Sequence, residues 1–307
     1  MKRLLASELL RFRSRRLVVV LFAGTIIGTV VGCVIAAIES TPPTDAVLAE
    51  AQVQADQEVA NCLVADYADV NFGDMTLEEF CNDQFGDATQ YVPSHLALVD
   101  LPGILEGVAS ITTILGLMVG ASVVAVSWQT GTIGTIFSWE PRRWRWFASR
   151  LLVIAVGVFA IVLAWMAVVT GGIALAAATR GSTIGMDPEV WRDVVLTSLR
   201  IAAVASFAAV VGGGVAAMGR HTAAALAAVF VYAAVVEGLI RGFRPLWTPW
   251  LLGDNVVTVV SWRTLEVGLF PTGSYTLEPV RATFVILGYA AVILAFAFTF
   301  VRVRDVQ

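Results

Sequence analysis

The chain has 307 residues, of which 58% are hydrophobic and 14% are charged, and its formal net charge is −4. Soluble domains contain about 45–50% apolar residues even when glycine is counted, so this composition argues against a soluble enzyme with one core, a disordered chain or a disulfide-rich miniprotein. Sustained apolar runs of about 20 residues instead predict an all-α integral membrane protein with several spans.

Six apolar stretches along the chain predict six transmembrane helices. About 20 helical residues cover the ~30 Å hydrocarbon layer, and a helix satisfies its own backbone hydrogen bonds there. The fourth and fifth stretches are short and are separated by four residues, which predicts a tight helical hairpin. The expected spans are Leu17–Ile38, Gly107–Trp128, Leu151–Ala178, Ile201–Met218, Ala223–Ile240 and Ala282–Val301.

Basic residues are distributed unevenly between the two sides of the predicted membrane. With the N-terminus inside, the inner segments hold 13 of the 20 Lys and Arg residues. The segment Glu39–Pro102 holds none of them, but 13 of the 24 acidic residues. The positive-inside rule then places both termini in the cytoplasm. We therefore expect a multi-pass protein of the plasma membrane, surrounded by membrane lipid.

Two segments on the expected outer side are long enough to carry structure of their own. Residues 39–106 form an extracellular cap loop, with helix-compatible composition over Asp45–Tyr67 and an N-terminal helix signal at Asp74–Glu79. Residues 241–281 begin with a stretch rich in Trp and Pro, which is typical of short helices in the membrane interface.

Two of the three cysteines lie in the polar, acidic outer segment. We expect Cys62 and Cys81 to form a disulfide in an oxidising compartment, because such a bridge would stiffen the cap. It would close a loop of about 20 residues and contribute about 3 kcal/mol on a chain-entropy estimate. Cys33 lies inside an apolar run and is expected to be a small buried apolar residue.

Motifs for covalent or metal chemistry are absent from the sequence. A P-loop needs a Lys after a glycine-rich turn, and Lys2 is the only Lys and has no such turn before it. The two histidines, His95 and His221, fall on opposite sides of the predicted membrane, and no H-E-x-x-H, C-x-x-C or G-x-S-x-G pattern occurs. We therefore expect no catalytic residue, metal or cofactor in this chain and no nucleic-acid partner. An intramembrane enzyme is the weaker alternative.

The inner segment 129–149 is the most informative part of the sequence. It opens with small residues that permit a turn, continues as an amphipathic stretch over Ile133–Trp139, and is stopped by Pro141. Arg and Trp residues alternate after the proline, which suits the lipid headgroup region. One interpretation is a membrane anchor that obeys the positive-inside rule. The other is a coupling element that docks on a cytoplasmic partner.

This segment resembles the loop after the second span of ATP-binding-cassette (ABC) exporter permeases that work with a separate ATPase, in the form found in actinobacterial members. The family pattern reads Gly-Thr-hydrophobic, a hydrophobic pair, Pro-x-Arg, and a basic residue that opens the third span, here Arg150. Many relatives carry an acidic residue just before Gly-Thr, which this chain lacks. The resemblance assigns ATPase coupling to Gln129, Gly131, Thr132, Ile133, Ile136, Phe137, Glu140, Pro141, Arg142 and Arg143.

The resemblance implies a single transmembrane permease domain over residues 1–307. It would pair with a second permease copy or a homologous permease and with two cytoplasmic ATPase subunits, and those partners would bind ATP and Mg. Segment 129–149 would pass the motion of the ATPases to the spans. Residues 1–16 would form an interfacial amphipathic helix on the inner surface, with an ordinary basic flank as the alternative. Its expected apolar face consists of Leu4, Leu5, Leu9, Leu10 and Phe12.

Glycines at helical spacing indicate where helices approach closely in lipid. Gly24, Gly28 and Gly32 lie on one face of the first span. That face would contact either another helix of the same chain or a second permease. Gly116–Gly120 and Gly212–Gly214 give the same signal more weakly.

Glu237 is the clearest ionisable residue inside a predicted span. Burying a carboxylate in lipid is costly, so Glu237 must face protein or water. We expect a structural pair with Arg241, four residues further along the helix, near the outer end. A substrate or proton contact is the alternative.

From these observations we expect an ABC transporter permease that exports an amphiphile, lipid, peptide or drug and depends on a partner for ATP hydrolysis. The alternative is a non-transport membrane assembly or sensory protein whose extracellular cap binds a ligand or partner.

Overall fold

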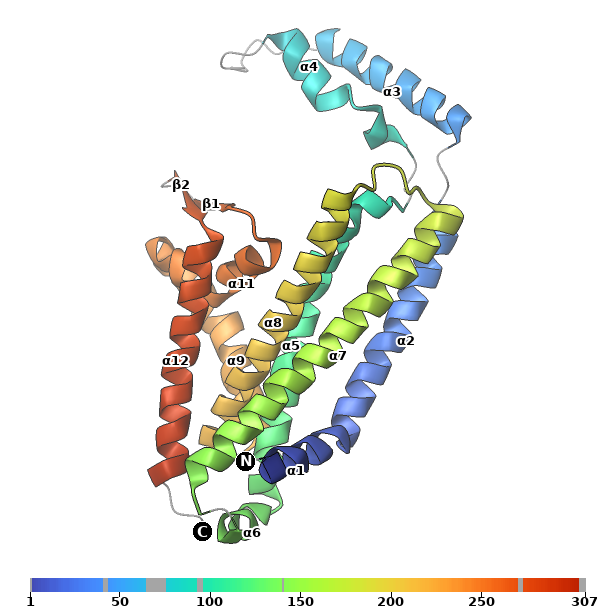
Figure 1. Ribbon diagram of the computed structural model, residues 1–307. Coiled ribbons are helices and arrows are strands. Elements are labelled where there is room, and N and C mark those ends of the chain that lie inside the picture. Colours follow the sequence, from blue (N-terminus) through green and yellow to red (C-terminus); the bar gives the residue numbers. More distant parts are fainter. Residues whose placement is uncertain are drawn as a thin grey trace. The chain divides into compact units, whose positions relative to one another are not determined.

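The computed structural model describes residues 2–40, 44–64, 76–92, 96–139, 141–269 and 273–303, and most of them are helical (Figure 1). The chain forms two compact units. The first contains Met1–Ile27, Pro102–Val168 and Pro188–Gln307, and the second contains Gly28–Leu101 and Val169–Asp187. Helices α2 (Arg16–Glu39) and α7 (Arg143–Arg180) contribute residues to both units.

Within the described residues, six helical segments are long and apolar enough to cross a membrane. Each contains one of the six apolar stretches seen in the sequence, so the prediction of a mainly α-helical chain with six potential spans is confirmed. Besides α2 and α7, these segments are α5 (Leu101–Gln129), α8 (Pro188–Gly219), the run from α9 (Thr222–Phe230) to α10 (Glu237–Phe243), and α12 (Pro279–Val303).

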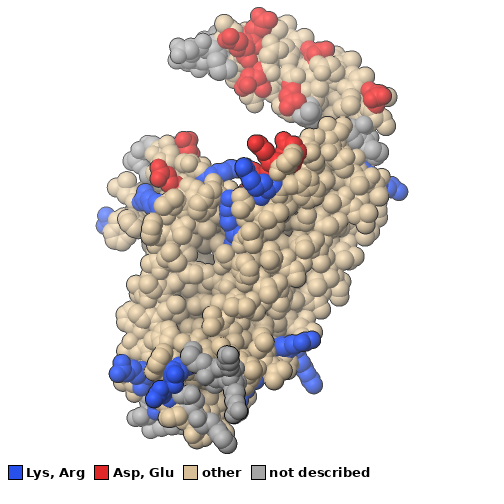
Figure 2. Space-filling view, viewed as in Figure 1, with Lys and Arg blue, Asp and Glu red and all other residues tan. Residues whose placement is uncertain are grey.

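Charged side chains on the helices of the first unit gather at the two ends, and a broad uncharged band lies between them on the visible face (Figure 2). A helix that crosses a bilayer needs this distribution, because its middle contacts hydrocarbon and its ends contact headgroups and water. The space-filling view therefore agrees with the hydropathy of the six segments.

The fourth span is longer than the sequence indicated. We expected a short span over Ile201–Met218, but α8 begins at Pro188 and has 32 residues. Helix ends are set by backbone and capping preferences, and proline is favoured in the first helical turn, whereas our prediction followed apolar continuity alone. For the same reason α7 begins at Arg143, so the basic end of segment 129–149 is helical rather than a loop.

The predicted hairpin between the fourth and fifth spans is confirmed. Arg220 adopts a left-handed conformation with φ of 56°, and His221 caps α9 by accepting a hydrogen bond at Nδ1 from the Ala223 N–H at 3.1 Å. The fifth span then contains a π-helix, η3 (Val231–Val236), between α9 and α10. This single wide turn accommodates an extra residue within the span.

Glycines bring the backbones of α5 and α8 into direct contact. A Cβ added at Gly116 or Gly120 would collide with the carbonyl oxygen of Ala205 or Ala209, respectively. In the opposite direction, Gly212 lies against the carbonyl of Leu117. The weaker of the two glycine signals in the sequence therefore marks a direct backbone contact between two helices of the first unit.

The stronger glycine signal does not mark an internal contact. No atom of the described residues lies within 4 Å of a Cβ added at Gly24, Gly28 or Gly32, and all three positions on α2 are exposed. The described residues therefore give no support to the intramolecular alternative for this face. Contact with a second permease remains a prediction.

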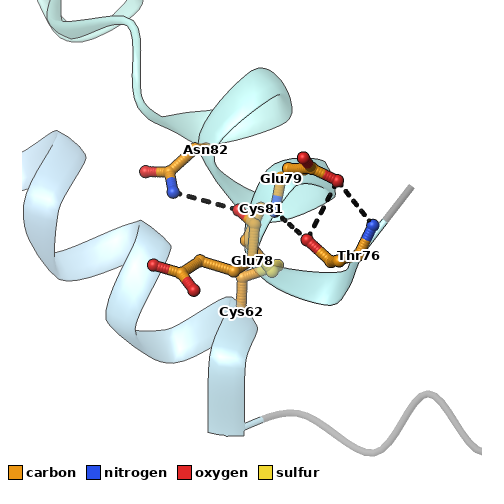
Figure 3. The surroundings of a disulfide bond; sticks show 6 residues. All are labelled: Cys62, Thr76, Glu78, Glu79, Cys81 and Asn82. Carbon is orange, nitrogen blue, oxygen red and sulfur yellow. Dashed lines mark hydrogen bonds between the residues drawn. A yellow bond between two sulfur atoms is a disulfide. The ribbon is translucent and has the colours of Figure 1, made fainter.

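In the second unit, a disulfide joins α3 (Asp45–Val64) to α4 (Leu77–Phe85), as Figure 3 shows. Cys62 and Cys81 are bonded with a Cα–Cα distance of 5.8 Å, which confirms the expected pairing. Both expected helices are present, although Ala65–Tyr67 and Asp74–Met75 lie outside the described residues. The short helix η1 (Ala88–Tyr91) packs on α3.

The start of α4 is fixed by a capping box. The Glu79 N–H donates to Thr76 Oγ1 at 3.2 Å, and the Thr76 N–H donates to Glu79 Oε2 at 2.8 Å (Figure 3). These hydrogen bonds from Thr76 lower the pKa of the Glu79 carboxyl, because they stabilise its ionised form. The reciprocal cap satisfies two N–H groups that would otherwise lack partners at the helix end.

Residues 241–281 contain the short helices that the sequence predicted, η4 (Pro245–Trp250) and α11 (Leu252–Ser261). They also contain an antiparallel hairpin that was not predicted, formed by β1 (Leu265–Leu269) and β2 (Gly273–Leu277). The hairpin register pairs Leu265 with Leu277. Helix α11 packs on α12 and on α8.

The α5–α8 contact predicts that two glycine substitutions differ in their effect on stability. Gly120→Ala forces a methyl group against the Ala209 carbonyl and should cost about 1–3 kcal/mol, the typical penalty for overpacking. Gly28→Ala meets open space and should cause no loss. Unfolding of the purified protein in mixed micelles measures both, and equal destabilisation by the two variants would contradict the packing described.

The disulfide predicts a local effect on the second unit. Cys62→Ser or Cys81→Ser should weaken the α3–α4 pair by about 3 kcal/mol, because the unfolded loop gains freedom. Limited proteolysis of intact membranes should then cleave between α3 and α4 faster than in the wild type. Cys33→Ser is the control and should leave the cleavage rate unchanged, since Cys33 is not bonded.

Candidate functional site

A short helix, α6 (Thr132–Trp139), joins α5 to α7 beyond the ends of both (Figure 1). The turn before it depends on Gly131, whose φ of 67° disfavours any residue with a Cβ. The two neighbouring threonines support the turn, since Thr130 Oγ1 donates to the Val126 carbonyl at 2.8 Å and lies 3.0 Å from Thr132 Oγ1. The Gly-Thr element of the sequence is therefore the corner between the second span and α6.

One face of α6 is anchored to the spans. The Ile133 side chain is buried, and the Phe137 ring meets the Trp146 ring edge-on with centroids 5.4 Å apart. The Arg143 guanidinium lies 5.3 Å from the Phe137 ring centroid. Trp146 itself is fully buried in α7 and anchors this contact. Three of the predicted coupling residues therefore attach the helix rather than present a free surface.

The remaining predicted coupling residues lie mostly on the outside of the segment. Ile136 is half-buried. Glu140 lies outside the described residues. Exposed positions of the segment are Gln129, Thr130, Gly131, Thr132, Gly134, Thr135, Ser138, Pro141, Arg142 and Trp144. The segment thus has an anchored apolar face and an exposed face of mostly small and polar residues, with the Trp144 ring also exposed.

Behind α6, a charged side chain is buried at the start of the third span. Arg150 is 2% exposed, and its Nη1 and Nη2 atoms donate to Ser127 Oγ at 2.7 Å and to the Val123 carbonyl at 2.6 Å. Its Nε atom lies 3.7 Å from Oε2 of Glu8, an ion pair beyond hydrogen-bonding distance. Glu8 is also 2% exposed and lies on α1 (Lys2–Arg13). The pair therefore connects α1, α5 and α7.

A second arginine reaches the same end of α5. Arg15, in the bend between α1 and α2, donates from Nη1 to the Ser122 carbonyl at 2.8 Å. Its burial lowers the pKa of the guanidinium, while the charge of Glu8 opposes that shift. Glu8 also pairs with Arg11 at 3.0 Å. Two guanidinium groups thus donate to backbone carbonyls of neighbouring residues on α5.

Two faces of α1 have different surroundings. Leu9 and Leu10 are 54% and 70% exposed, whereas Phe12 is buried and packs against Gly157 of α7. Glu8 shares the buried face with Phe12, four residues further on. Leu9 and Leu10, from the expected apolar face, therefore remain free to face lipid.

A sequence signal for the buried pair existed and was missed. Arg150 stands at the edge of a long apolar run, and an arginine there needs a counter-ion. The inner segments of the predicted topology hold only three acidic residues, which are Glu8, Glu140 and Asp305. Because residues 1–16 were considered only as a basic segment, Glu8 was not recognised as the partner of Arg150.

The predicted pair of Glu237 and Arg241 is part of a larger cluster. Arg241 Nη2 lies 3.6 Å from Glu237 Oε2 but donates to Asp254 Oδ1 at only 2.9 Å. Glu237 Oε1 accepts the N–H of Gly253 at 3.0 Å and so caps the start of α11. The Tyr275 hydroxyl donates to Asp254 at 3.2 Å, and burial together with that carboxylate raises the pKa of Tyr275 to about 12. The cluster holds α10, α11 and β2 together, which supports the structural interpretation.

No family model matches the chain, and no curated protein and no solved structure is significantly similar to it. Across the described ranges, no three His, Cys, Asp or Glu side chains gather as metal ligands would. We therefore take the exposed face of α6, which lies next to the buried network of Arg150, Arg15 and Glu8, as the candidate functional site.

The buried pair predicts a strong effect of removing one charge. Glu8→Gln leaves the Arg150 guanidinium in a buried site without its counter-ion, and breaking such a pair costs about 3–5 kcal/mol. We expect a large fall in the thermal unfolding midpoint of the purified protein. The double variant Glu8→Gln/Arg150→Met should recover part of that loss, since neither charge then stays buried alone.

The matched control is Glu266→Gln, which changes an exposed carboxylate on β1 of the same unit. It should leave the unfolding midpoint unchanged. If Glu8→Gln left the unfolding midpoint unchanged, as Glu266→Gln should, the Glu8–Arg150 pair would not contribute to stability.

Proposed function

We propose that this chain is the membrane-spanning permease subunit of an ATP-driven ABC transporter whose ATPase is a separate polypeptide. The observation that carries the proposal is the construction of α6, which is fixed to the spans by one face and exposed on the other. A helix that receives force from a partner needs both properties, because a loose loop would absorb the motion. The resemblance of segment 129–149 to the coupling loop of ABC exporter permeases supports the same interpretation.

The buried network connects α6 with three other helices. Phe137 contacts Trp146 on α7, and Arg150, one turn further along α7, binds the carbonyl of Val123 on α5 and faces Glu8 on α1. Separating these groups would leave buried charges without partners, which is costly. A displacement of α6 would therefore move the inner ends of α1, α5 and α7 together.

In this proposal two cytoplasmic ATPase subunits bind ATP and Mg and close against the exposed face of α6. The proposal places both termini on the cytoplasmic side together with α6, as the excess of basic residues in the inner segments predicts. A second permease copy or a homologous permease completes the transporter, and the exposed glycine face of α2 is the surface we assign to it.

The proposed cargo is an amphiphile. An apolar groove of about 730 Å³ runs beside the outer half of α12, and its lining consists of Trp250, Glu278, Val280, Arg281, Phe284, Val285, Gly288, Tyr289 and Val292. Arg281 lies 5.3 Å from the Trp250 ring. A groove with apolar walls and charged groups of both signs near one end suits a molecule with an apolar body and a polar head.

The experiment tests coupling through the exposed face of α6. The tagged chain is purified from membranes of its native host, and co-purified subunits and Mg-ATP hydrolysis are measured. We expect an ATPase subunit in near-equal amount, and we expect Thr135→Arg, at an exposed position of α6, to remove most of it and of the hydrolysis. Gln54→Arg, an equally exposed change on α3, should alter neither.

The alternative, a sensory or assembly protein with a binding cap, predicts the reverse pattern. Thr135→Arg would then have no effect on the purified complex, and no ATPase would be present with the wild type. That result, together with the absence of nucleotide-driven flux in vesicles that contain the purified material, would overturn the proposal.

A further inference from the structure

A pocket of about 350 Å³ opens at the other end of α5 from α6. Its walls are the first two turns of α5, the part of α8 between Arg192 and Arg200, and the residues Trp262 and Arg263 that follow α11. All of these elements belong to the first unit. The pocket is separate from α6 and from the cluster around Glu237.

The pocket has an excess of positive charge. It is lined by the guanidinium groups of Arg192, Arg200 and Arg263 and by the carboxylates of Glu106 and Asp193, which leaves one net positive charge. Figure 2 shows these kinds of side chain side by side at this end of the helices. A protein surface with unbalanced charge at a concave site attracts an oppositely charged ligand.

The protein balances the charge of these arginines only in part, because the carboxylates of Asp193 and Glu106 attract Arg200 without a direct ion pair. In the part of the chain that the structure describes, Arg200 and Arg263 have no ion pair and no side-chain hydrogen bond, and Arg192 approaches only Asp193, at 3.9 Å. Arg192 and Asp193 are 68% and 52% exposed, so their pair contributes little. The donor groups of the pocket are therefore available to a ligand.

An aromatic side chain is held in place over the pocket. Arg200 lies 5.2 Å from the ring centroid of Trp262, a cation–π contact. Trp262 ends α11 in a left-handed conformation with φ of 54°, and its N–H donates to the Thr258 carbonyl at 3.0 Å. This helix end fixes the backbone that carries the indole ring.

The depth of the pocket matches the headgroup layer. Arg200 directly precedes the apolar stretch that starts at Ile201, and Arg and Trp are the residues that gather at this boundary. Beside the pocket, α8 presents apolar side chains to the outside, with Val195 55% and Leu199 38% exposed. An acyl chain can lie along this surface while its head occupies the pocket.

We propose that this pocket binds the phosphate group of an anionic amphiphile, such as the phosphodiester of phosphatidylglycerol. Guanidinium groups present several N–H donors in a plane and bind phosphate oxygens in pairs. A phosphodiester carries one negative charge, which balances the single excess positive charge of the pocket. A headgroup that also carries a cation, such as phosphatidylcholine, leaves that excess in place. The proposal does not depend on an ATPase partner.

Native mass spectrometry of the purified full chain in detergent tests this assignment with phosphatidylglycerol and phosphatidylcholine as probes. We expect phosphatidylglycerol to bind more tightly than phosphatidylcholine. Arg263→Gln and Arg200→Gln should each weaken phosphatidylglycerol binding about fivefold, the effect of one basic residue near a membrane surface. Arg244→Gln, an exposed arginine of the same segment but outside the pocket, is the matched control and should leave binding unchanged.

A second arm distinguishes a lipid from a soluble anion. Inorganic phosphate at millimolar concentration should not displace phosphatidylglycerol if the acyl chains contribute to binding. If inorganic phosphate displaced phosphatidylglycerol at that concentration, the pocket would still bind phosphate, but its ligand would be a soluble anion rather than a lipid. Equal binding of the two lipids, or equal weakening by Arg244→Gln and Arg263→Gln, would overturn the proposal. Unchanged thermal unfolding midpoints confirm that the variants are folded.

Discussion

The buried guanidinium group of Arg150, at the start of the apolar part of α7, determines how α1, α5 and α7 pack together. Arg150 cannot remain without partners in a site that is 2% exposed, so α5 supplies a hydroxyl and a carbonyl, and α1 supplies a carboxylate. Meeting these needs fixes the N-terminal helix against the third span. Phe12, which fills the space left by Gly157, strengthens the same contact.

The network also explains why a short connection between two spans can be functionally important. The segment α6 has only eight residues, and a free helix of this length is not stable in water. This helix is stable here because the Ile133 side chain is buried and the Phe137 ring packs on Trp146 of α7, one turn before Arg150. The proposed coupling role thus follows from attachment, and the exposed polar residues give the segment a surface that a partner can recognise.

The sequence predicted the spans well and their ends poorly, for a physical reason. Apolar continuity locates the part of a helix that contacts lipid, but Pro188 and Arg143 begin helices in polar stretches where continuity gives no signal. The cap helices and the Cys62–Cys81 bridge were predictable because a capping box and a cysteine pair are local. The pair of Glu8 and Arg150 spans 142 positions in sequence, and no local pattern brings it together.

Glycine placement sets which parts of the bundle can move. Where Gly116, Gly120 and Gly212 bring two backbones into contact, α5 and α8 have no side-chain layer between them that could slide or repack. This contact should make α5 and α8 resist movement relative to each other, and α5 connects α6 at one end with the arginine-lined pocket at the other. If a partner displaces α6, as we propose, the two helices should tilt together and change the shape of that pocket.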